Sequence, residues 1–125
     1  MTRAMALGTM ILCAGICAAS PDNTAPVFAC NLKAIRAADR PRYTELVKRV
    51  RAAVADRREI SNGYAYQLDS QAVTPPEAAE WMSMERLCCP FLTLQLSVSG
   101  RQPHWLLTLT GPEGVKPLLD VEFPR

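Results

Sequence analysis

The sequence predicts an α+β domain in which helices pack on one face of an antiparallel sheet of about three strands. Apolar residues recur at three- and four-residue steps over residues 41–59, which is typical of a helix. Apolar and polar residues alternate over 91–99 and again over 104–110, which is typical of a β-hairpin. The length of 125 residues fits one domain. The expected order of elements is α-β-α-β-β-α.

The first 19 residues have the layout of a secretory signal peptide. Arg3 supplies a positive charge, residues 4–19 contain no charged residue, and a polar segment begins at Ser20. Small residues near Ala19 predict cleavage after it, and the uncharged run is shorter than the roughly 20 residues of a spanning helix. We therefore expect a protein exported to the periplasm or secreted, with no stable transmembrane span after cleavage.

Two alternatives to cleavage remain open. An uncleaved signal would anchor the chain in the membrane. Lipid attachment at Cys13 or Cys17 is disfavoured, because Leu12 and Ile16 precede these cysteines where a small residue is needed. Cleavage would leave three of the five cysteines, namely Cys30, Cys88 and Cys89. An odd number in an exported chain leaves at least one thiol without an internal disulfide partner.

The elements before the second helix are predicted from prolines, periodicity and turn residues. Residues 20–29 contain two prolines and no periodicity, which indicates an extended lead-in before a single domain over 30–125. The first helix is expected from about 41 to 59, with Asn62-Gly63 as its stop signal. Acidic residues interrupt its basic face and the net charge is only +2, so we expect no nucleic-acid partner. A strand over 63–69 follows.

The second helix is expected to begin at Thr74, which suits an N-cap, and to end before Pro90. The hairpin follows it, with Leu92, Leu94, Leu96 and Val98 on one face of its first strand. Gly111-Pro112-Glu113-Gly114 opens a short last helix that Pro117 is expected to interrupt.

Two adjacent thiols, Cys88 and Cys89, lie at the end of the second helix. The helix dipole is negative there and disfavours a thiolate, so a self-activated nucleophile is not expected. A soft ion supplies its own positive charge and deprotonates the thiols that bind it. With Cys30 as a third ligand, the set suits Zn²⁺, Cu⁺, Hg²⁺ or arsenite, and Glu85 can add an oxygen ligand or accept a proton.

Other roles for these cysteines remain open. Cys30 can form a structural disulfide with Cys88 or Cys89 in a non-catalytic structural or interaction module. Cys88 can be a packed core residue, or the two neighbours can join as a strained vicinal disulfide. A thiol-disulfide oxidoreductase is the third class, since a resolving thiol lies beside an attacking one. The sequence contains no HExxH motif and no dinucleotide fingerprint, and we assign no catalytic residue.

Three segments resemble a family of small uncharacterised bacterial proteins: Cys30-Asn31-Leu32, Glu85-Arg86-Leu87-Cys88-Cys89-Pro90-Phe91-Leu92, and residues 107–116. The resemblance covers roughly residues 29–119, and similar segments are attached to some MerR-type regulators. It implies that Cys30, Glu85, Cys88 and Cys89 belong together. The link to regulators that respond to metals favours soft-ion or thiol chemistry, as an association. The predicted signal peptide and Pro117 depart from the family pattern.

Overall fold

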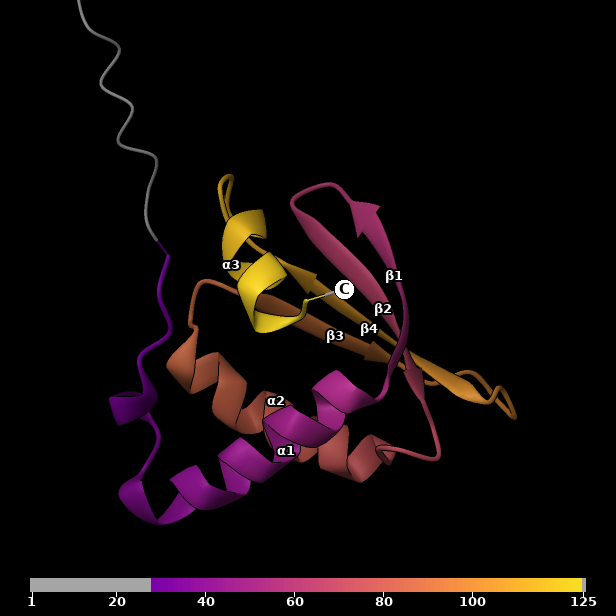
Figure 1. Ribbon diagram of the computed structural model, residues 1–125, viewed down its shortest axis with the longest axis horizontal. Coiled ribbons are helices and arrows are strands. Elements are labelled where there is room, and N and C mark those ends of the chain that lie inside the picture. Colours follow the sequence, from indigo (N-terminus) through magenta and orange to yellow (C-terminus); the bar gives the residue numbers. More distant parts are fainter. Residues whose placement is uncertain (1–27, 125) are drawn as a thin grey trace, which may run out of the picture.

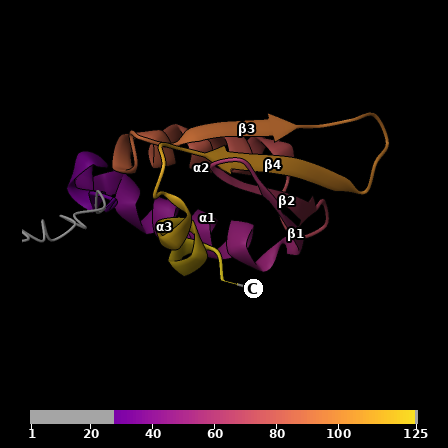
Figure 2. The ribbon, with the colours of Figure 1, turned by 90° about the horizontal axis from the view of Figure 1, so that it is seen from above.

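The computed structural model describes residues 28–124 and shows an α+β domain with a four-stranded antiparallel sheet in the order β1-β2-β4-β3 (Figure 1). Three α-helices pack on the face of this sheet that carries its buried side chains, and Figure 2 shows the same elements from above. The predicted signal peptide over 1–19 and most of the predicted lead-in lie outside the described residues. The elements are η1 Leu32–Ala34, η2 Ala37–Asp39, α1 Arg40–Ala52, β1 Val54–Ile60, β2 Gly63–Asp69, α2 Pro75–Cys88, β3 Thr93–Ser97, β4 His104–Thr110 and α3 Lys116–Glu122.

The prediction of one helix over 41–59 is wrong in its second part, because α1 ends at Ala52 and β1 begins at Val54. The sheet therefore has four strands rather than about three, in the order α-β-β-α-β-β-α. β1 is an edge strand rich in charged residues, which is how edges avoid further pairing. A bulge between Val54 and Asp56 breaks the period-two pattern that would have revealed a strand.

The Asn62-Gly63 pair closes a hairpin and does not stop a helix. Ile60 pairs with Gly63, and Asn62 has a φ of 57°, the left-handed conformation that Asn tolerates in tight turns. The predicted strand over 63–69 is confirmed as β2. Its partner on the other side is β4, so β2 lies inside the sheet.

The predicted hairpin over 91–110 is confirmed as β3 and β4. Leu94 faces Leu109 and Leu96 faces Leu107, and these side chains point toward the helices. Val98 was expected to continue this face, but it lies beyond the end of β3 and is 47% exposed.

The core between the sheet and the helices is built from aliphatic and aromatic side chains of every major element except β1 and β3. The apolar side chains of these two strands are only partly buried.

Pro117 does not interrupt the last helix. It occupies the first turn of α3, where the N–H that proline lacks would have no partner within the helix. Within residues 28–124, no helix is both long enough and apolar enough to cross a bilayer.

Gly63→Ala is expected to destabilise the domain by about 1–3 kcal/mol, the range for overpacked sites. A Cβ at this position would lie 1.9 Å from the backbone oxygen of Leu109, so β2 and β4 would have to separate locally. Urea denaturation measures the loss. Gly100→Ala is the contrasting variant, because a Cβ there meets nothing within 4 Å and only its φ of +51° opposes the change. A smaller loss for Gly63→Ala than for Gly100→Ala would contradict the prediction.

Candidate functional site

Helix α2 carries the candidate site at its carboxyl end. Its start is fixed by a capping box, in which the Thr74 side chain accepts from the N–H of Glu77 and the Glu77 carboxylate accepts from the N–H of Thr74. The helix ends at Cys88, before the sequence Cys89-Pro90, as predicted from the proline. The face toward the core consists of Ala78, Trp81, Met84, Glu85 and Cys88.

The segment before η1 crosses this helix end and is joined to it covalently. Cys30 and Cys89 form a disulfide with their Cα atoms 4.8 Å apart. The N–H of Asn31 also donates to the carbonyl oxygen of Cys88 at 2.9 Å, which satisfies one carbonyl group that the end of a helix leaves open. Cys89 is the C-cap residue with a non-helical φ of −123°, so its side chain can turn toward Cys30. Of the two predicted pairings, the structure therefore has Cys30 with Cys89.

Cys88 is a free thiol beside this disulfide and is completely buried. The Sγ atoms of Cys30, Cys88 and Cys89 all lie within 4.8 Å of one another. The structure thus brings together the three cysteines that the sequence proposed as ligands. Burial, followed by the negative charge of Glu85, raises the pKa of the Cys88 thiol, so it keeps its proton at neutral pH.

Glu85 is buried in the core, with 2% of its surface exposed. Tyr43, on α1, donates its hydroxyl to Oε2 of Glu85 at 2.7 Å. Burial raises the pKa of the Glu85 carboxyl, and it also raises the pKa of Tyr43. The Glu85 carboxylate is not part of the three-sulfur group, so its assignment as an oxygen ligand stays a prediction.

The sequence pattern places Tyr43 in the helix predicted over 41–59 and assigns it no role at the site. The signal that could have identified it is general: a buried tyrosine needs a partner for its hydroxyl, and Glu85 is a buried carboxyl. Arg86, which follows Glu85 in the chain, is exposed to solvent.

Glu85→Gln is expected to make stability less dependent on pH. The raised pKa means that the unfolded chain releases the Glu85 proton at lower pH than the folded chain does, so wild-type stability falls as pH rises above about 4.3. The amide does not titrate and can still accept from Tyr43 through its carbonyl oxygen. Urea denaturation of both proteins from about pH 4 to pH 7 compares the slopes. Parallel pH profiles would show that Glu85 has no raised pKa.

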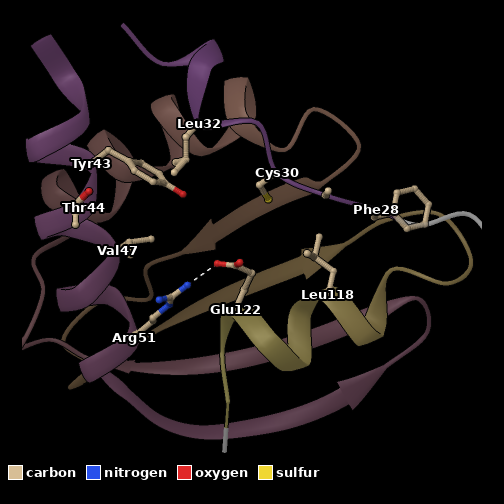
Figure 3. A pocket seen from close by; sticks show the side chains of 10 residues that line it. Phe28, Cys30, Leu32, Tyr43, Thr44, Val47, Arg51, Leu118 and Glu122 are labelled. Carbon is tan, nitrogen blue, oxygen red and sulfur yellow. Dashed lines mark hydrogen bonds and ion pairs between the residues drawn. The ribbon is translucent and has the colours of Figure 1, made fainter. Parts of the chain in front are cut away.

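A cavity of about 470 Å³ opens beside the disulfide, between α1, α3 and the segment before η1 (Figure 3). Cys30 is partly exposed on its wall, and the Tyr43 hydroxyl also lines it. Most of the remaining wall is apolar. Its two charged side chains, Arg51 and Glu122, form an ion pair with each other across the cavity (Figure 3).

Comparisons of this chain with protein-family models, with curated proteins and with solved structures find no match. The functional proposal is therefore built on the geometry of the three sulfurs and of the cavity next to them.

Proposed function

We propose that this protein binds one soft metal or metalloid ion through Cys30, Cys88 and Cys89, and that the Cys30–Cys89 disulfide is its oxidised, ion-free state. The observation that carries the proposal is the approach of three Sγ atoms within 4.8 Å of one another. Thiolates bind soft ions at about 2.3 Å, so sulfurs that share an ion lie within about 4.6 Å of one another. A small movement of these side chains is enough to create the site.

Reduction has to precede binding, because Cys30 and Cys89 share a bond in the oxidised chain. A small thiol is a suitable reductant. It attacks Cys30, the partly exposed sulfur, and forms a mixed disulfide while Cys89 leaves as a thiol. A second thiol molecule attacks the mixed disulfide, which frees Cys30 and gives the disulfide of the small thiol. Two electrons and two protons are thereby transferred to the protein.

The reduced protein is expected to bind about one Hg²⁺, Zn²⁺ or As(III) ion per chain. Replacing both Cys88 and Cys89 with serine is expected to abolish this binding, because a single thiol remains. The measurement is the ion content of reduced protein after gel filtration under argon. Ser83→Ala is a matched control, since Ser83 is an exposed residue of the same helix. An unchanged stoichiometry in the double variant would sink the proposal.

The second candidate is a structural or interaction module in which the disulfide is a staple. The bond between Cys30 and Cys89 favours it, since it joins the start of the described chain to the end of α2. Mass spectrometry of the protein taken from the periplasm distinguishes the two. A permanent Cys30–Cys89 bridge with one free thiol indicates the staple, whereas three free or ion-loaded thiols indicate the site.

A thiol oxidoreductase is the weakest of the three candidate classes. Its attacking thiol has to be acidic and accessible, whereas burial raises the pKa of Cys88. Iodoacetamide reactivity of the reduced protein across pH tests this class. An unusually acidic thiol would favour it over the two others.

A further inference from the structure

The ligand of the candidate site has to arrive through the cavity at Cys30. Cys88 and Cys89 are both 0% exposed, so neither sulfur is open to solvent directly. Cys30 is partly exposed on the cavity wall, and its sulfur points toward the cavity in Figure 3. A molecule from solvent therefore meets Cys30 first and reaches the two inner sulfurs from there. The character of the cavity wall then decides which ligands can approach.

The cavity wall favours an uncharged ligand. Leu32, Val47 and Leu118 give it an apolar lining. The Arg51 and Glu122 side chains are paired with each other, so their charges largely cancel at the position of a ligand. A divalent cation finds no unpaired carboxylate among the residues of this wall to replace the water molecules that it gives up. A small neutral molecule does not carry the charge that makes this loss of water costly.

We infer that the ligand of the three sulfurs is the neutral hydroxide of a trivalent metalloid, of which arsenous acid is the simplest case; this rests on the proposed function. In the reaction, three As–OH groups meet the thiols of Cys30, Cys88 and Cys89. Three As–O bonds break and three As–S bonds form. Each thiol proton leaves with a hydroxide as water, so three water molecules are released. Arsenic stays trivalent, and no net proton or electron is exchanged.

The number of ligands also fits this ligand better than it fits a divalent cation. The three sulfurs form a group by themselves within the described residues, whereas structural Zn²⁺ takes four ligands in a tetrahedron. Trivalent arsenic is saturated by three sulfurs, since a lone pair occupies its fourth position.

The test is a titration of the reduced protein under argon with arsenous acid, prepared from sodium arsenite and adjusted beforehand to the pH of the protein solution, or with Zn²⁺ or Hg²⁺, in weakly buffered solution with a pH indicator. We expect about one arsenite to bind per chain with almost no net release of protons. Zn²⁺ is expected to bind with a dissociation constant at least about 100-fold higher and to release protons as it binds. Cys88→Ser is expected to weaken arsenite binding by about tenfold or more, because one of three bonds is lost.

The outcomes separate the inference from the proposed function. If Zn²⁺ or Hg²⁺ binds through the three cysteines and arsenite does not, the inference is overturned and the proposed function stands. If no ion binds, the proposed function itself falls. If arsenite binds equally well to Cys88→Ser, a two-sulfur site replaces the three-sulfur site and the inference is again overturned.

A charge placed in the cavity provides an independent measurement. Leu118 is partly exposed on the cavity wall, so Leu118→Glu adds a negative charge there, and Leu118→Gln is the uncharged match. The rate of arsenite binding is expected to be the same in both variants within about twofold, whereas Zn²⁺ should bind faster to the charged variant. An arsenite rate that depends on this charge would contradict entry as a neutral molecule.

Discussion

Replacing Cys30 and Cys89 together with alanine is expected to lower the free energy of unfolding of the oxidised protein by about 4 kcal/mol. The two residues are 59 positions apart, and the bridge between them restricts a large part of the unfolded chain. Chain-entropy estimates for loops of this size give about 4 kcal/mol. This is a large part of the roughly 5–15 kcal/mol by which domains are stable. Urea denaturation with and without a reductant measures the difference.

The same experiment has two internal comparisons. Reduction of the wild-type protein is expected to have nearly the same effect as the double substitution, because both remove the same bond. Cys88→Ala is the matched variant: it truncates the neighbouring buried thiol but keeps the bridge, and its loss should be closer to about 1 kcal/mol. If oxidised and reduced wild-type proteins unfold at the same urea concentration, the bridge does not stabilise the fold.

Trp81→Ala is expected to cost about 3–5 kcal/mol, the range for truncating a buried aromatic side chain. Trp81 is 0% exposed and packs edge-on against Phe123, with 5.9 Å between the ring centroids. It occupies the same face of α2 as Glu85 and Cys88, so a cavity here removes packing beneath the thiol site. Thermal unfolding of the oxidised protein measures the loss of stability.

Trp81→Phe is the control for this prediction. It keeps an aromatic ring in the core and is expected to cost clearly less than Trp81→Ala. The indole Nε1 makes no hydrogen bond of normal geometry within residues 28–124, so the phenylalanine variant leaves no strong partner unsatisfied. Similar losses in the two variants would mean that ring packing is not what stabilises this part of α2. Reduced protein carrying Trp81→Ala should also bind its ion more weakly.

The sequence placed Cys88 and Cys89 at the end of α2 because the signals for this helix end are local. Pro90 follows Cys89 directly and fixes the end of α2 at Cys88, and the alternating pattern of the hairpin starts soon afterwards. Proline geometry and period-two alternation depend on neighbouring residues, so both can be predicted without a structure. The approach of Cys30 to this point was a hypothesis from the cysteine number, and the 4.8 Å Cα separation confirms that a bridge is possible.

The features that the sequence did not predict depend on contacts between distant segments. β1 has few apolar residues, and its strand character comes from pairing with β2. The Tyr43–Glu85 hydrogen bond joins positions 42 residues apart. The choice of Cys89 over Cys88 follows from the backbone conformation at the C-cap, and the cavity at Cys30 forms only when α1 and α3 pack near the same segment. No local pattern contains this information.

Cys30 and Cys89 belong both to the disulfide and to the proposed three-sulfur site, so oxidation would exclude ion binding at that site. A ligand that binds only the reduced chain must therefore raise the reduction potential of this bond. The shift is about 30 mV for every tenfold excess of free ligand over its dissociation constant, since two electrons are transferred. One pair of sulfur atoms would then respond to two quantities at once, the redox state of the compartment and the concentration of the ion.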